Sequence, residues 1–134
     1  MLDPHGALVY TMVLVSGAET SMGETERAII GDIIGHLSVF RSFDPHQLGG
    51  HLNDCADLLS GDDGLDKTLA AIKAALPERL RETAYAIACD LIAADGEATQ
   101  EELQILELIR HRLEIGRLAA AAIERGARAR FRKL

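Results

Sequence analysis

The sequence predicts an all-α fold of about seven helices. Alanine, leucine and isoleucine recur three and four positions apart, which is the spacing of an amphipathic helix. No segment of useful length alternates apolar and polar residues as a half-buried strand does. Only 4% of the 134 residues are aromatic, and 48% are hydrophobic. This composition favours a helical core without a sheet.

Three helices are expected in the first half of the chain. The first covers residues 6–18 and is apolar over most of its length, and the second covers residues 23–37. The third runs to residue 60, because Asp44 can cap its start and Pro45 has no N–H to lose at the first helical position. The second helix presents one apolar stripe, formed by Ile29, Ile30, Ile33 and Leu37.

Four further helices are separated by helix breakers. The glycine- and aspartate-rich cluster at residues 60–64 ends the third helix, and Pro77 divides the fourth helix from the fifth. The fifth helix is closed by Gly96, which can adopt the left-handed conformation at low cost. The four helices are expected at residues 65–76, 77–94, 99–113 and from 115 onward.

Two helical hairpins repeat within the chain. The acidic stretch at residues 94–103 has a degraded copy at residues 18–27, and the same offset pairs Ile105 with Ile29. Because apolar positions repeat together with the carboxylates, we expect the hairpins to pack as a pseudo-symmetric pair. We also expect one domain over residues 1–134. The repeated hairpins cover residues 7–37 and 83–113, and a basic end covers residues 125–134.

Charge is unevenly distributed along a chain of net charge −7. Every acidic residue lies at or before Glu124, whereas basic residues crowd the last ten positions. The acidic body disfavours a broad nucleic-acid surface. The basic end could contact RNA, an anionic membrane or an acidic partner. Its spacing is also that of a solvated last helical turn, where cations are favourable, and we prefer this interpretation.

Cysteine usage and hydropathy favour a soluble cytoplasmic protein. Cys55 and Cys89 lie in helical patterns beside apolar neighbours and lack Cys-x-x-Cys spacing, so we expect buried thiols in a reducing compartment. The apolar run at residues 7–16 is shorter than the roughly 20 residues that span a bilayer, and it lacks a basic leader. No transmembrane segment is therefore expected.

The second acidic turn has the spacing of half an EF-hand loop. Asp95, Gly96, Thr99 and Glu102 stand at the steps of a carboxylate, the sharp-turn glycine, a weaker oxygen ligand and the closing glutamate. Leu91 and Ala93 occupy the steps of the first two acidic ligands, which excludes a complete EF-hand. The missing oxygens could come from the related turn, if the hairpins bring Glu19 and Glu26 toward the later pair.

Helix capping is a competing explanation for the same residues. Thr99 followed by Glu102 is a capping box, and Ser21 followed by Glu24 is another. Each box would satisfy backbone N–H groups at a helix start without any metal. On spacing alone, capping is the simpler explanation.

Taken as a whole, the chain resembles the TerB family of tellurite-resistance-associated proteins. The resemblance covers essentially the entire chain. It rests on the apolar helix at residues 84–92, which runs into Ala93-Ala94-Asp95-Gly96 and closes with Glu102-Leu103, on a weaker counterpart at residues 8–26, and on the helix count. It implies a compact all-α bacterial domain with a divalent-cation site between the two hairpins, and a non-catalytic role in stress response beside membrane proteins of the same system.

The family's acidic turn matches this chain unevenly. It falls with good fit on Asp95, Gly96 and Glu102, and with poorer fit on Glu19 and Glu26. The first turn has Thr20 where the family commonly has glycine, and a β-branched residue resists the left-handed conformation. Asp90 is a secondary candidate ligand that could instead pair with an arginine. Ligation by oxygen alone favours calcium, magnesium or manganese over zinc.

We therefore expect an ion sensor or adaptor that performs no catalysis, located in the cytoplasm or at the inner face of the membrane, with a protein partner. Two alternatives remain open. One is a metal-independent interaction module with an acidic face. The other is a carboxylate-bridged di-iron protein, which would need Glu-x-x-His pairs that the sequence lacks.

The histidines and nucleophiles suggest no catalytic site. Glu107 with His111 and Asp32 with His36 are spaced four apart and are expected as exposed helix-face pairs. Neither cysteine has a clear histidine partner, and there is no Gly-x-Ser-x-Gly motif. We expect His46 and His51 on the surface and His5 in a mobile end.

Overall fold

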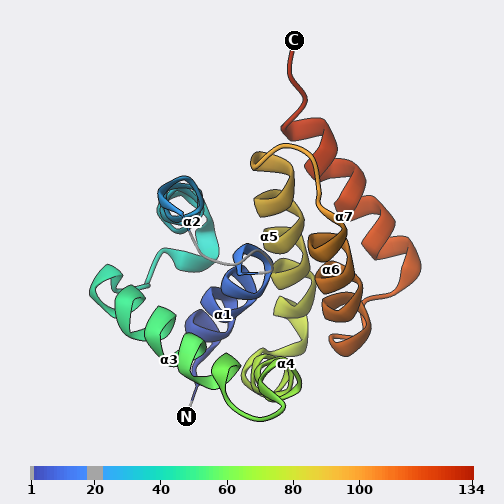
Figure 1. The fold of residues 1–134 in the computed structure, drawn as a ribbon. Helices are drawn as coiled ribbons and strands as arrows, with labels where there is room; N and C mark the ends of the chain where they lie inside the picture. Colours follow the sequence, from blue (N-terminus) through green and yellow to red (C-terminus); the bar gives the residue numbers. More distant parts are fainter. Residues whose placement is uncertain (1, 18–22) are drawn as a thin grey trace.

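The computed structural model describes residues 2–17 and 23–134, and it is all-helical over that part of the chain (Figure 1). Its α-helices are α1 (Pro4–Ser16), α2 (Glu24–His36), α3 (Leu48–Ser60), α4 (Gly64–Ala75), α5 (Arg81–Ala94), α6 (Gln100–Arg112) and α7 (Arg117–Arg130). Its 3-10 segments are η1 (Ser38–Phe40), η2 (Pro45–Gln47) and η3 (Glu78–Leu80). The predicted all-α fold of about seven helices is confirmed.

Helix α1 forms the centre of the bundle. Every residue from Gly6 to Ser16 is buried, because α3, α4, α5 and α6 all pack against this helix. A helix that is apolar on all sides is stable in water only when it is enclosed in this way. The helix begins at Pro4 rather than at residue 6, since Asp3 Oδ1 accepts a hydrogen bond of 2.7 Å from the Gly6 N–H. None of the described helices is long and apolar enough to cross a membrane.

The two internal prolines lead into 3-10 turns instead of α-helices. Asp44 caps η2 as predicted, with its Oδ1 accepting from the His46 N–H at 3.0 Å, but α3 begins only at Leu48. Pro77 likewise precedes η3, and α5 begins at Arg81. Tight turns of this kind are frequent at helix N-termini, so the expected starts were a few residues early.

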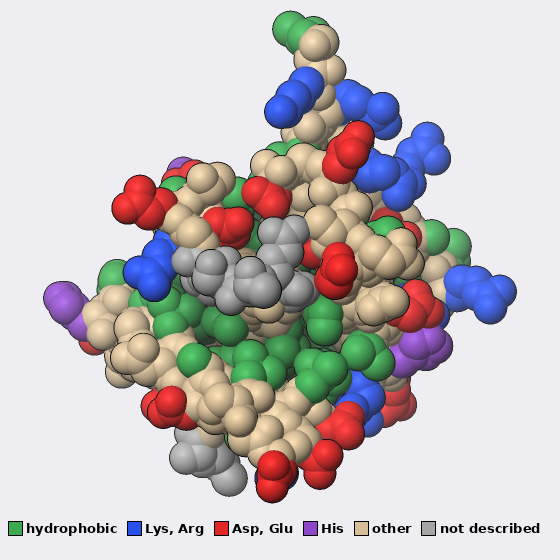
Figure 2. All heavy atoms as spheres, viewed as in Figure 1, with side chains coloured by type: hydrophobic (Ala, Val, Ile, Leu, Met, Phe, Trp, Pro, Cys, Tyr) green, Lys and Arg blue, Asp and Glu red, His purple; other side chains and the backbone are tan. Residues whose placement is uncertain are grey.

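The hairpins α1–α2 and α5–α6 pack through a reciprocal set of contacts. Helix α1 lies against α5, and the cross-contacts join α1 to α6 and α2 to α5. The contacts within the hairpins differ, because α5 packs against α6 whereas α1 and α2 make little direct contact. Helix α7 covers α5, and its C-terminal end extends beyond the bundle (Figure 1). Figure 2 shows Lys and Arg side chains gathered around this extended end.

Two expectations about histidine are wrong. His5 is not in a mobile end, because it lies in the first turn of α1, with Nε2 2.7 Å from the Val39 carbonyl oxygen and its ring 5.7 Å from that of Phe40. His51 is half-buried and stacks on Phe43 at 6.2 Å. The apolar faces of these phenylalanines attract the imidazoles, and this tertiary contact has no signal in the spacing. His46 is exposed, as predicted.

Candidate functional site

A small hollow lies where α1, α2, α5 and α6 meet. Its volume is about 10 Å³, close to the smallest that admits one water molecule. A guest of this hollow would therefore be one water molecule or one ion. It is lined by Val15, Ser16, Glu26, Ile29, Leu91, Asp95 and Glu102.

The hollow brings together carboxylates from both hairpins. Glu26 lies in the first turn of α2 and is half-buried. Asp95 is the exposed C-cap residue of α5, and Glu102 lies in the first turn of α6. Between the later two, Gly96 has φ 111°, the positive value that glycine was expected to supply at this turn. The fourth predicted ligand, Glu19, lies outside the described residues, as do Thr20 and Ser21.

Glu102 also caps α6. Its Oε1 accepts from the Thr99 N–H at 2.9 Å, and the Thr99 hydroxyl oxygen accepts from the Glu102 N–H at 3.1 Å. The predicted capping box at these two residues is therefore present. The box gives one oxygen of the Glu102 carboxylate a hydrogen-bond donor, but it brings no positive charge near that carboxylate. At the start of α2, the described cap is Gly23, without a side-chain hydrogen bond.

The carboxylates of the hollow have no cationic partner among the described residues. Glu102 is only 5% exposed, and none of the ion pairs of the described part involves it, Glu26 or Asp95. Buried charges in proteins are ordinarily paired or bound to a metal, because desolvating them alone is costly. Glu102, the one buried carboxylate of the three that line the hollow, therefore lacks the positive charge that its burial calls for.

Ser16 adds a neutral oxygen to the same hollow. Its side chain is 7% exposed, and its Oγ is buried without a hydrogen-bond partner in the described part of the chain. A buried hydroxyl usually has a partner, such as a fixed water molecule. The sequence did not point to Ser16, because the residue is not acidic, and its position at the end of α1 matters only once α2 and α6 are in place.

The carboxylates border the hollow without coordinating a common point. As the side chains are placed, no three His, Cys, Asp or Glu residues of the described ranges are close enough together to hold a metal ion. An ion at this hollow would therefore need Glu26, Asp95 and Glu102 to move toward one another.

Asp90 lies in a different arrangement from the three carboxylates of the hollow. Its Oδ1 pairs with Arg130 and so ties α5 to the end of α7. Asp90 was expected either to bind the cation or to pair with an arginine, and the structure shows the pair with an arginine. Asp90 is not among the residues that line the hollow.

The two acid–histidine pairs are exposed, as expected. His111 Nε2 lies 3.0 Å from Glu107 Oε1, which also accepts from Arg110 at 3.0 Å. The Arg110 hydrogen bond, together with that of His111, holds the pKa of Glu107 below its usual value. His36 Nδ1 lies 2.7 Å from the Asp32 carbonyl oxygen, so this pair involves the backbone of Asp32 instead of its carboxylate.

Both thiols are buried and unpaired, as the sequence predicted. Cys55 is in the core between α1 and its neighbours, and Cys89 faces the groove beneath α7. Burial raises the pKa of each thiol to about 12. At neutral pH both are protonated, and a protonated thiol is neither a good nucleophile nor a metal ligand.

Comparison of the chain with protein-family models, with curated proteins and with solved structures finds no match. The resemblance to the TerB family therefore stands on its residues alone.

Proposed function

We propose that this chain is a non-catalytic domain that binds one divalent cation and acts as an ion sensor or adaptor. The ligands would be Glu26, Asp95 and Glu102, with Glu19 as a fourth that lies outside the described residues. One observation carries the proposal: a buried glutamate shares a hollow with two further carboxylates, and no basic residue is among the described residues that line it.

The donor set favours a hard cation. Carboxylate oxygens and the Ser16 hydroxyl border the hollow, and no sulfur or imidazole nitrogen accompanies them among the described residues. Calcium, magnesium and manganese prefer such oxygen ligands, whereas zinc favours nitrogen and sulfur. The volume of the hollow also suits a single ion better than an organic molecule.

A sensor needs two states that the ion distinguishes. Because the carboxylates border the hollow without a common point of coordination, binding would draw the first turn of α2 toward the α5–α6 turn. A partner that contacts either turn would then distinguish the two states. A location in the cytoplasm or at the inner face of the membrane, a partner within a membrane-associated stress system, and a role in tellurite tolerance belong to the same proposal. They rest on the TerB resemblance alone.

Thermal unfolding of a charge-neutral cap variant tests the proposal. Glutamine at residue 102 can still complete a capping box, so Glu102→Gln removes the charge and keeps the cap. Glu101→Gln is the matched control, because Glu101 is the exposed neighbour on the same turn of α6. With an ion at 100 times its dissociation constant, the wild type should gain about 2.7 kcal/mol over the EDTA sample.

Glu102→Gln should lose this gain, and Glu101→Gln should keep it. Superimposable wild-type curves in EDTA, calcium, magnesium and manganese would contradict the proposal, as would a Glu102→Gln protein that keeps the full shift. Iron content after aerobic loading, together with an optical spectrum, tests the di-iron alternative, whose Glu-x-x-His pairs are missing from the sequence.

The metal-independent interaction module has one observation in its favour. The capping box already gives Glu102 a role that needs no ion. A pull-down of a partner that is unchanged by EDTA and by Asp95→Asn would favour this module over a cation-dependent adaptor.

A further inference from the structure

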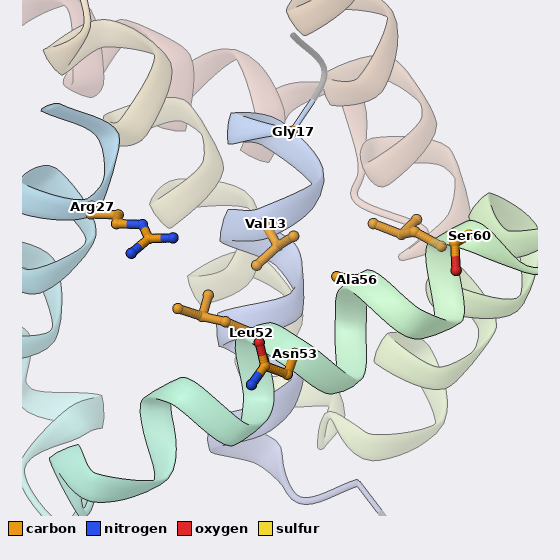
Figure 3. Close-up of a pocket in the computed structure, with 8 residues that line it drawn as sticks. Val13, Gly17, Arg27, Leu52, Asn53, Ala56 and Ser60 are labelled. Carbon is orange, nitrogen blue, oxygen red and sulfur yellow. The ribbon is translucent and has the colours of Figure 1, made fainter. Parts of the chain in front are cut away.

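A second and larger hollow lies between α1, α2 and α3 (Figure 3). Its volume is about 460 Å³, within the range of about 300–1,000 Å³ that small-molecule sites occupy. Its walls are mainly apolar side chains of α1 and α3, so an aliphatic guest would leave water on entering it. The apolar lining comprises Val13, Leu52, Ala56 and Leu59.

Arg27 gives this hollow its charge. Figure 3 shows its guanidinium extending from α2 toward Val13 on α1, with Leu52 of α3 reaching into the same space. No acidic residue is among the described residues that line the hollow, although the chain has 21 Asp and Glu residues. In an acidic protein, a hollow whose one charged lining residue is an arginine is electrostatically selective for an anion.

Arg27 is the lining group of this hollow that is suited to an anion. Arg27 takes part in none of the ion pairs formed by the described residues. The Asn53 side chain lies farther down in Figure 3, on the other side of Leu52 from the guanidinium. The Ser60 hydroxyl already donates to the Asp57 carbonyl oxygen at 2.9 Å and so has no proton to offer. The anionic head of a guest would therefore meet Arg27.

We propose that this hollow binds a small amphipathic carboxylate, with one aliphatic chain and one anionic head. The aliphatic chain would lie against Val13, Leu52 and Leu59, and the carboxylate would accept the two parallel hydrogen bonds that a guanidinium presents. A purely polar anion would gain nothing from the leucines, and an uncharged hydrocarbon would leave Arg27 without a partner. The site shares no lining residue with the carboxylate hollow, and a guest could enter it without an ion bound there.

Paired titrations with decanoate and decanol test this site. The two ligands share a chain and differ in the charge of the head, and EDTA in both titrations removes any contribution from a divalent cation. In methyl NMR spectra, decanoate should shift the resonances of Val13, Leu52 and Leu59. It should leave those of Leu103 and Leu106, which line the groove between α5, α6 and α7, unchanged. Decanoate should bind about tenfold more tightly than decanol, equivalent to about 1.4 kcal/mol.

Two variants with matched controls locate the binding. Arg27→Gln should raise the dissociation constant of decanoate about tenfold, to that of decanol; Arg41→Gln, at another exposed arginine, should leave the preference unchanged. Ala56→Trp fills the hollow from an exposed position on α3 and should abolish binding of both ligands. Ala70→Trp, at an exposed position on α4, should not.

Three results would overturn the proposal. The first is the absence of shifts at Val13, Leu52 and Leu59 with decanoate, including the case in which Leu103 and Leu106 shift instead. The second is an Arg27→Gln protein that still prefers decanoate to decanol. The third is an Ala56→Trp protein that is helical by circular dichroism and binds both ligands as the wild type does.

Discussion

Glu26, in the first turn of α2, and Asp95, at the end of α5, border the same hollow. They belong to different hairpins of the sequence and meet only because α2 packs against α5. Glu102 and the Ser16 hydroxyl complete the oxygen lining. Each of these groups can be changed separately, so the hollow can be tested one oxygen at a time.

Ser16→Ala should weaken cation binding without lowering stability in EDTA. The Ser16 hydroxyl is buried without a partner in the described structure, so its removal should leave the free energy of unfolding unchanged or raise it by about 1 kcal/mol. Thr68→Val is the contrasting variant, because the Thr68 hydroxyl donates to the Gly64 carbonyl oxygen at 2.7 Å and its loss should cost about 1 kcal/mol. Urea unfolding in EDTA measures both. Equal losses in the two variants would mean that the Ser16 hydroxyl is hydrogen-bonded in solution.

Asp90→Asn should reduce stability slightly and leave cation binding intact. Asp90 pairs with Arg130, and the side chains of the two are 18% and 55% exposed. A pair on the surface contributes about 0.2–1 kcal/mol, and the shielding of Asp90 places this pair toward the upper end of that range. Arg130→Gln should have the same effect, and the double variant should show that the two losses are coupled. Thermal unfolding of Asp90→Asn at increasing calcium concentration measures cation binding, and the variant should show the same thermal shift as the wild type. A lost thermal shift in this variant would make Asp90 a ligand.

Tyr85→Phe should destabilise the contact between α5 and α7. The buried Tyr85 hydroxyl donates to Glu124 Oε2 at 2.6 Å, and burial with this hydrogen bond raises the pKa of the tyrosine. Its removal leaves the Glu124 carboxylate short of a donor, at a cost of about 1–3 kcal/mol. Tyr10→Phe, at a buried tyrosine whose hydroxyl has no hydrogen bond in the described structure, should cost less. Chemical denaturation would contradict this account if the two variants lost equal stability.

The buried thiols should make the protein less stable at alkaline pH. Burial raises the pKa of Cys55 and Cys89 to about 12 in the folded state, against about 8.5 for an exposed thiol. Between these values the unfolded chain binds fewer protons than the folded protein. The free energy of unfolding should therefore fall as pH rises from about 8.5 toward 12.

Urea unfolding at a series of pH values measures this slope, and Cys55→Ala and Cys89→Ala should each reduce it. In the native protein at neutral pH, both thiols should resist a disulfide reagent until denaturant is added. Rapid labelling of the folded wild type would contradict burial of the thiols.

Local signals predicted the helices well because most are set by local chemistry. The Asp44 cap, the Thr99–Glu102 capping box and the positive φ of Gly96 depend on residues a few positions apart. The predicted starts of α1, α3 and α5 were less accurate. The 3-10 turns at Pro45 and after Pro77 precede two of these helices, and short-range rules do not fix the first turn of a helix.

The site was only partly predictable from sequence. The internal repeat suggested that Glu26 would lie near Asp95 and Glu102, and the three line one hollow. Nothing in the sequence indicated Ser16 in this hollow or Arg27 in the larger hollow between α1, α2 and α3. A serine at a helix end and an arginine on an exposed face become lining residues only when other helices pack beside them. The stacking of His5 and His51 on phenylalanines was missed for the same reason.

The most direct measurement is an anomalous difference map from crystals soaked in manganese. The account predicts one peak in the hollow between α2, α5 and α6, with oxygens of Glu26, Asp95 and Glu102 at coordination distances of about 2.0–2.6 Å. A map without a peak at this hollow, or with manganese bound only elsewhere, would contradict the claim that the two hairpins share a divalent cation.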